Sequence, residues 1–305
     1  MKKNITYLCM AAAALLVSSC TQNEEITPTI ENEGRVPVLF TAKNSAVLET
    51  KVNDYLFTSD EIGISMLSAD DENAIETNVC FKPDGGGTGE VTLSPYNGVD
   101  PIYYPTDGSN VQFNAYLPYK TSTSNTITWI FNEEEKYVFY TATTKGDGKT
   151  YNESTGLEQS VSLVFKHRLA RISIDIESKD YKVGNGVTAT LSNHPVSFDY
   201  NILTDEITPS EDKQPLNATP NGNQRVFYVL PEALTQAETV TMNLPDGVSF
   251  EATLTPPTDG FKAGVQYKYK TTLTATKTQG TFKAILEGFS TQEMGTLTST
   301  EKISE

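Results

Sequence analysis

Apolar and polar residues alternate over short stretches along most of the chain, and clusters of glycine, proline, asparagine and aspartate separate these stretches. The clearest stretch is 111–117, where Val111, Phe113, Ala115 and Leu117 occupy every second position. A period of two residues is typical of a strand with one buried face, whereas an amphipathic helix repeats every 3.6 residues. Long stretches with the helical period are missing. Many short strands joined by turn residues favour an all-β sandwich.

The apolar period changes face near Ala170 and Arg171. Apolar side chains occupy odd positions from Val161 to Leu169 and even positions from Ile172 to Ile176. A shift of one residue moves every side chain to the opposite face of a strand, so we expect a bulge or a change of sheet here. We place a domain boundary just after this segment. The prediction is an N-terminal β-sandwich domain over 36–177 and a C-terminal one over 178–305.

The first predicted strand contains a proline. Val36, Val38 and Phe40 alternate, and Pro37 lies between the first two. Proline has no N–H to donate to a neighbouring strand, so it is confined to edge strands, strand starts and bulges. We therefore predict a peripheral edge strand at this point. Residues 43–54 show no apolar period and are predicted to form a loop.

The N-terminus has the pattern of an export signal. Two lysines precede an apolar run over 7–17, which is shorter than the ~20 residues of a spanning helix. Residues 16–20 resemble a bacterial lipobox, in which the cysteine, here Cys20, is acylated with fatty acids such as palmitate. The resemblance implies a lipoprotein signal peptide over 1–19. A plain secretory peptide cleaved near Ser18 or Ser19 is the alternative, and residues 20–35 are predicted to be an acidic, flexible tether.

Charge and cysteine content limit which partners the chain can bind and how its fold can be stabilised. The formal net charge is −16, and removal of Lys2 and Lys3 with the signal brings it to −18. Such a surface repels phosphate backbones, so no nucleic-acid partner is expected. After processing and acylation Cys80 is the one free cysteine, so no internal disulfide is possible and burial must hold the fold together.

Candidate chemistry is sparse, and we predict neither an enzyme nor a bound cofactor or metal. His167 lies on a strand face and is predicted to be packed or hydrogen-bonded, while His194 precedes a proline. Two histidines in such different settings do not suggest a zinc site. Acidic pairs are expected to be solvated turns, although weak calcium binding at 70–72 is conceivable. They are Asp60-Glu61, Asp70-Asp71-Glu72 and Glu133 to Glu135.

Several ordered segments resemble the fimbrillin-like proteins of Bacteroidetes, the subunits of type V pili. No single segment is diagnostic, but their order and spacing are fairly specific. The segments are Cys20 to Glu25, Val36 to Thr41, Thr50-Lys51, Asp60 to Ile64, Tyr103-Tyr104-Pro105, Val111 to Tyr119 and Val164 to Ala170. After about residue 177 the resemblance is confined to the β-rich pattern.

The resemblance implies two tandem transthyretin-like, Greek-key sandwich domains and a mechanism of assembly. A lipid-anchored precursor at the outer membrane is cut by a trypsin-like protease, the first strand leaves, and a strand of another subunit fills the groove. The candidate cleavage sites are Lys51, then Lys43, then Arg35. Arg35 precedes the strand, so a cut there would leave the groove filled. The released strand carries Val36, Val38 and Phe40, and the donor segment is Phe282 to Phe289 or Leu297 to Ile303.

The resulting hypothesis is a structural subunit or adhesin of a cell-surface fimbrium, whose partners are other pilus subunits and, as candidate ligands, host glycans or proteins. Stalk, tip and anchor roles all remain open. The alternative is a surface glycan-binding lipoprotein of a nutrient uptake system. It requires exposed aromatic side chains on which sugars stack. The candidates are Trp129, Tyr103, Tyr104, Tyr116 and Tyr119.

Overall fold

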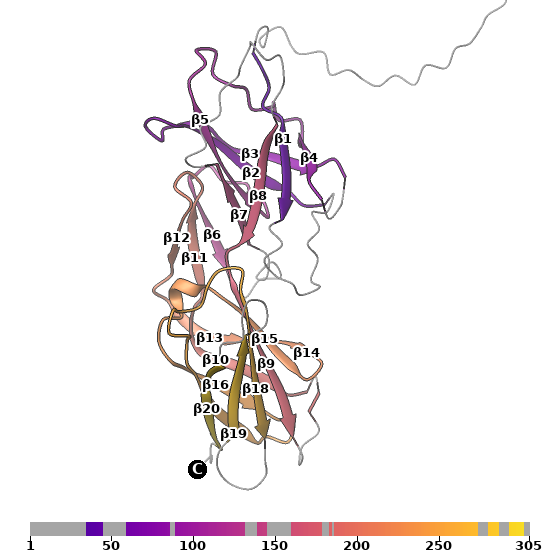
Figure 1. Ribbon diagram of the computed structural model, residues 1–305, viewed down its shortest axis with the longest axis vertical. Coiled ribbons are helices and arrows are strands. Elements are labelled where there is room, and N and C mark those ends of the chain that lie inside the picture. The colour runs from indigo at the N-terminus through magenta and orange to yellow at the C-terminus, as the bar shows by residue number, and fades with distance from the viewer. Residues whose placement is uncertain are drawn as a thin grey trace, which may run out of the picture. The chain divides into compact units, whose positions relative to one another are not determined.

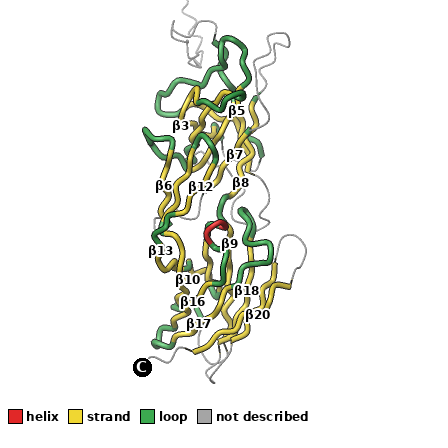
Figure 2. The backbone as a smooth tube through the Cα atoms, turned by 90° about the vertical axis from the view of Figure 1, so that its left-hand side faces the viewer, coloured by secondary structure: helices red, strands yellow, loops and turns green. Residues whose placement is uncertain are grey.

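The all-β prediction is confirmed by the computed structural model. The residues described are 35–44, 59–85, 89–131, 139–144, 160–178, 183–184, 186–273, 280–286 and 293–301. Within these ranges the chain forms strands β1 to β20, and the helical segment is a single 3-10 turn, Pro231–Ala233 (Figure 2).

Seven strands of the first half close into a barrel in the order β1-β4-β3-β2-β5-β7-β8 (Figure 1). The strands are β1 (Phe40–Asn44), β2 (Ile62–Ser68), β3 (Ala74–Pro83), β4 (Val91–Pro95), β5 (Val111–Leu117), β7 (Tyr140–Thr143) and β8 (Val161–His167). The prediction for this half was a sandwich of two sheets. The observed barrel differs from that sandwich because β1 pairs with both β4 and β8. Without β1, those two strands would be the free edges of an open sheet.

The barrel interior is filled by the apolar face of each strand. Strand β5 contributes the four residues predicted from its alternation, all of them buried. Its other face is buried as well. On that face Asn114 accepts a hydrogen bond from Thr143 Oγ1 (2.8 Å) and donates one to the Leu203 carbonyl. The sequence pattern predicts that this polar face is solvated, whereas in the structure the hydrogen bonds of Asn114 replace those it would make with water.

The remaining strands form two further sheets. A ten-stranded sheet has the order β13-β10-β16-β17-β20-β19-β18-β9-β15-β14, and a three-stranded sheet has the order β12-β11-β6. The strands are β6 (Thr126–Ile130), β9 (Ala170–Ser178), β10 (Thr188–Pro195), β11 (Ser197–Asn201), β12 (Glu206–Pro209), β13 (Lys213–Asn217), β14 (Thr219–Asn221), β15 (Gln224–Val229), β16 (Glu238–Asn243), β17 (Ser249–Leu254), β18 (Gln266–Leu273), β19 (Gly280–Leu286) and β20 (Glu293–Glu301).

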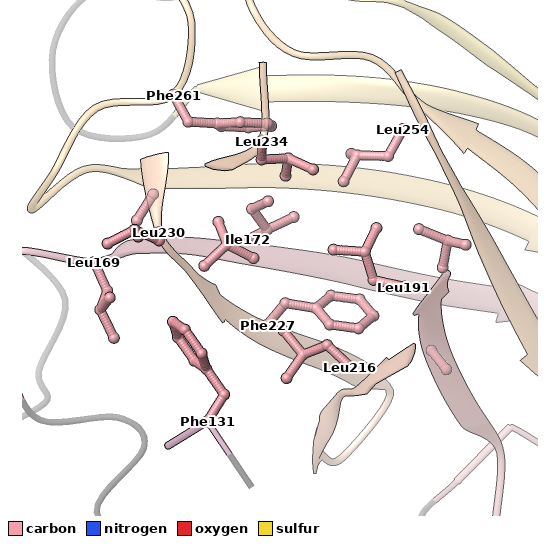
Figure 3. Packing of buried hydrophobic residues seen from close by; sticks show 14 of the residues in the cluster. Phe131, Leu169, Ile172, Leu191, Leu216, Phe227, Leu230, Leu234, Leu254 and Phe261 are labelled. Atoms are coloured by element: carbon pink, nitrogen blue, oxygen red, sulfur yellow. The ribbon is translucent and has the colours of Figure 1, made fainter. Parts of the chain in front are cut away.

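A second apolar core contains residues of both sheets, most of them from the ten-stranded sheet. Figure 3 shows part of it, in which Leu191 of β10 and Phe227 of β15 lie together with Phe131, which follows β6, and Leu169, which precedes β9. Arg225 is fully buried beside this core and donates hydrogen bonds to backbone carbonyls, among them those of Val187 and Gly222. A buried guanidinium is tolerated when its donors are satisfied, so these carbonyls stabilise Arg225 within the sheet.

The predicted change of sheet near Ala170 is confirmed. Strand β8 ends in the barrel at His167, and β9 begins in the ten-stranded sheet at Ala170, where it pairs with β15 and β18. This change in pairing lies inside the predicted range 36–177. The domain boundary after residue 177 remains a prediction. Strand β9, which lies before it, already belongs to the ten-stranded sheet, and β6 pairs with β11 in the three-stranded sheet.

Candidate assembly site at strand β1

Strand β1 is hydrogen-bonded along both sides. It runs antiparallel to β4, with Phe40 opposite Leu93, and parallel to β8, with Phe40 opposite Val161. The amide of Val161 also donates to the Leu39 carbonyl at 2.7 Å. The prediction of an edge strand is therefore wrong: β1 is an internal strand of a closed barrel (Figure 1).

Proline 37 misled that prediction because it lies outside the ladder. It precedes β1 by three residues and forms an isolated bridge with Tyr103. The flanking residues bond the same segment, since Val38 N–H donates to the Ile102 carbonyl (2.8 Å) and Tyr104 N–H donates to the Val36 carbonyl (2.9 Å). Residues 36–38 thus continue along the barrel without requiring an N–H from proline.

The inward face of this segment closes the barrel core. Val38, Phe40 and Ala42 are buried, with Phe40 at 1% and Ala42 at 0% exposure. The Phe40 ring packs edge-on against Phe81 (5.3 Å between centroids) and Phe113 (5.0 Å). Removing the strand would therefore expose two aromatic rings and leave a cavity of strand length between β4 and β8.

The outward face carries a carboxylate that the sequence analysis did not single out. Thr41 Oγ1 donates to Glu90 Oε1 at 2.6 Å, and Glu90 directly precedes β4. A hydrogen bond from Ser162 on β8, followed by the one from Thr41, lowers the pKa of the Glu90 carboxyl. Glu90 thus bonds β1 and β8 together, which no short motif predicts because Thr41, Glu90 and Ser162 lie far apart in the sequence.

Two exposed apolar side chains accompany this carboxylate. Leu39 is 39% exposed and Val164 is 37% exposed. Val164 lies on β8 directly opposite Lys43 of β1. The outward face beside β1 is therefore polar at Glu90 and apolar at Val164.

Of the predicted processing residues, two lie in the described part of the chain. Arg35 is exposed and precedes the barrel segment, while Lys43 is exposed but lies within the β1 ladder. Cleavage beside Lys43 would require part of the strand to open first. Lys51 and Cys20 lie outside the described residues, as do Glu133 to Glu135 and residues 1–34, which contain the predicted signal peptide and most of the tether.

Both histidines are packed, as predicted for His167. His167 Nδ1 accepts the Leu169 N–H at 3.0 Å, and its ring lies edge-on to Tyr140. His194 Nε2 accepts the Leu230 N–H at 3.3 Å, so Nδ1 carries the proton and donates to the Pro195 carbonyl at 2.9 Å. Burial lowers the pKa of His194 to about 4. These contacts assign both rings to the fold.

The other candidate groups show no arrangement for catalysis or metal binding. Burial, followed by the Glu61 carboxylate, raises the pKa of Cys80 to about 11, which keeps the buried thiol protonated. Asp71 bonds Asn73 within its turn, as expected of a solvated acidic turn. Across the part of the chain that the structure describes, no three acidic, histidine or cysteine side chains are placed to hold a metal ion.

The aromatic candidates for sugar stacking are withdrawn from solvent. Trp129, Tyr104 and Tyr116 are buried, and Tyr103 and Tyr119 are half-buried. Trp129 stacks on Phe198 and lies edge-on to Tyr116 within the second core. These five residues therefore do not form an exposed platform. Within the described segments, no helix has both the length and the apolar character needed to cross a membrane.

The geometry defines a class of protein: an all-β chain whose barrel is closed by the first strand of its described residues. Comparison with known proteins identifies the family. A sequence model described as "Fimbrillin-like" matches residues 50–287, and the chain belongs to this family. This membership confirms the resemblance seen in the sequence.

Individual relatives agree with the family assignment. The chain is similar to a protein of Bacteroides uniformis described as "Putative fimbrium subunit Fim1C", with 26% identity over 289 residues that cover 90% of this chain and 91% of the relative. A crystal structure described as "a putative cell adhesion protein" from Bacteroides uniformis has a TM-score of 0.63 at 22% identity, covering 85% of this chain and 99% of that one. Another so described, from Bacteroides ovatus, has a TM-score of 0.54 at 16% identity, covering 89% and 99%. At these identities the two structures show a shared fold.

Proposed function

We propose that the chain is a non-enzymatic structural or adhesive subunit of a fimbrium at the cell surface, assembled by exchange of strand β1. The observation that carries this proposal is the position of β1, which comes first in the described chain and yet closes the barrel between β4 and β8. Membership in the fimbrillin-like family and the similarity to a fimbrium subunit support it. The exposed aromatic platform that glycan binding requires finds no support in the five candidate residues.

In this proposal the precursor is exported, acylated at Cys20 and held at the outer membrane through the tether 20–35. The two halves are tandem transthyretin-like domains. A trypsin-like protease then cuts at Lys51, within the predicted loop 43–54. That position is favoured over Lys43, which is held in the ladder, and over Arg35, because a cut at Arg35 would free the body while β1 remains in place.

Departure of β1 supplies the driving force for assembly. The facing sides of β4 and β8 would lose their hydrogen-bond partners, and Phe81 and Phe113 would lose the ring of Phe40. Unpaired strand edges and exposed apolar surface both favour addition of a strand from another subunit. The partners are therefore other pilus subunits, with host glycans or proteins as further candidate ligands of the assembled fimbrium.

Limited trypsin digestion of the unacylated chain beginning at residue 20 tests the proposal. We expect cleavage at Lys51, loss of β1 and a ladder of oligomers on gels of non-boiled samples. The Lys51→Gln variant serves as the matched control and should stay monomeric under the same digestion. If mass spectrometry shows that β1 has left the barrel, that the chain after Lys51 is intact, and that no ladder forms at any concentration, assembly by strand exchange is refuted.

A further inference from the structure

The gap between β4 and β8 imposes a pattern on any strand that occupies it. In β1 the inward positions are an aromatic residue, Phe40, followed two residues later by a small one, Ala42, with no exposed surface. The outward position between them is Thr41, which donates to Glu90 at 2.6 Å. A replacement strand must therefore place an aromatic residue and a small residue inward and a hydrogen-bond donor outward.

Residues 282–285 of the chain itself match this pattern. Phe282 and Ala284 repeat the spacing of Phe40 and Ala42, and Lys283 takes the place of Thr41. Lys283 would bring an ammonium group to the carboxylate of Glu90. Ile285 would take the place of Lys43 and lie beside Val164, whose side chain is 37% exposed while β1 is in place.

The pair of phenylalanine and alanine alone does not identify the segment, because the same spacing recurs at Phe113 in β5, at Phe250 in β17 and at Phe261 before β18. The residue between them excludes the first two. It is Asn114 in β5 and Glu251 in β17, and a glutamate would repel Glu90. Lys262 follows Phe261, but residues 261–263 lie between β17 and β18, so 282–284 is the segment of the four that carries its cation within a strand.

The alternative C-terminal segment fits less well. With Leu297 in the place of Phe40, Thr298 could donate to Glu90, but Ser299 would fall at the position of Ala42. That position is completely buried, and a hydroxyl group placed there without a partner costs free energy. Charge and burial therefore both favour residues 280–286 over the tail.

We propose that Glu90 selects the incoming strand by pairing with Lys283 of a second copy of this chain, whose residues 280–286 take the place of β1 with Phe282 at the position of Phe40. This inference rests on the proposed strand exchange. It chooses between the two candidate donor segments, and it adds the register of the incoming strand and the carboxylate that selects it.

Charge reversal tests the pairing in the full mature chain. A recognition sequence for a site-specific protease, placed within residues 45–58, avoids the use of trypsin, which would also cut at Lys283. Four proteins are compared after cleavage: the parent, Glu90→Lys, Lys283→Glu and the double variant. Glu211→Lys is the matched control, because Glu211 is exposed and lies outside the barrel. Melting temperatures measured before cleavage verify that each variant folds.

We expect each single reversal to slow formation of the oligomer ladder about fivefold, as for a cross-strand ion pair converted to like charges, and the double variant to recover the parent rate. Glu211→Lys should assemble like the parent. If the parent assembles and Glu90→Lys assembles equally fast, or if the double variant is as slow as the single ones, the pairing is refuted while strand exchange stands. If the cleaved parent loses β1 and never assembles, strand exchange itself fails.

Discussion

Phe40→Ala is expected to destabilise the barrel strongly, because this side chain fills the centre of the position occupied by β1. Phe40 is 1% exposed, and burying such a side chain contributes about 1.5–3 kcal/mol. Its two edge-on contacts, with Phe81 and Phe113, add about 0.5–1.5 kcal/mol each. The total, about 4 kcal/mol, agrees with the roughly 3–5 kcal/mol lost when a buried phenylalanine becomes alanine.

Two measurements on the unacylated chain beginning at residue 20 verify this estimate. Denaturant unfolding gives the loss in free energy for the transition of the barrel, and hydrogen exchange of the amides in 40–44 reports how often β1 opens. Each 1.4 kcal/mol lost by the closed state corresponds to about a tenfold faster exchange where local opening dominates.

Leu39→Ala is the matched control, because Leu39 is the neighbouring residue and is 39% exposed. We expect it to cost about 0.5 kcal/mol or less, as is usual for surface positions. A loss below about 1 kcal/mol for Phe40→Ala, or a loss equal to that of Leu39→Ala, would show that the inward face of β1 does not hold the barrel closed.

Two further predictions concern other buried groups. The free energy of unfolding should fall as the pH drops from about 6.5 toward 4. The pKa of His194 in the folded chain is about 4, below its unfolded value, so the unfolded chain binds the proton first. This loss reaches about 3 kcal/mol, and His194→Gln should flatten this part of a plot of unfolding free energy against pH. Gly63→Ala should cost about 1–3 kcal/mol in denaturant unfolding, since a Cβ there would lie 2.7 Å from Tyr116 Cζ and 2.8 Å from Asn78 Oδ1, whereas Gly85→Ala, with open space around it, should cost less than about 1 kcal/mol.

Much of the strand content follows from local pattern. The alternation in 111–117 and the reversal near Ala170 predict strand β5 and the change of sheet, because a period of two residues states which side chains share a face. A different rule, that proline marks an edge strand, failed at β1. Pro37 correctly indicates an interruption of the ladder, but the interruption lies before β1, so the strand itself is not at an edge.

The candidate site was predicted only in part. Val36, Val38 and Phe40 were identified from their alternation, and the barrel segment contains them. Glu90 and Ser162 were missed because they lie far apart in the sequence and belong to no motif. Arg225 was missed for a related reason, since a charged residue is expected at the surface and only its carbonyl partners show why it is buried.

The sequence by itself determined the all-β fold class and the resemblance to the fimbrillin-like family. Each depends on local periodicity or on ordered short segments. The tertiary structure decided which strands are neighbours, and with that the closure of the barrel by β1 and the carboxylate that faces Thr41. Alternation specifies which face of a strand is buried but not which strand lies beside it, because pairing depends on contacts between residues that are distant along the chain.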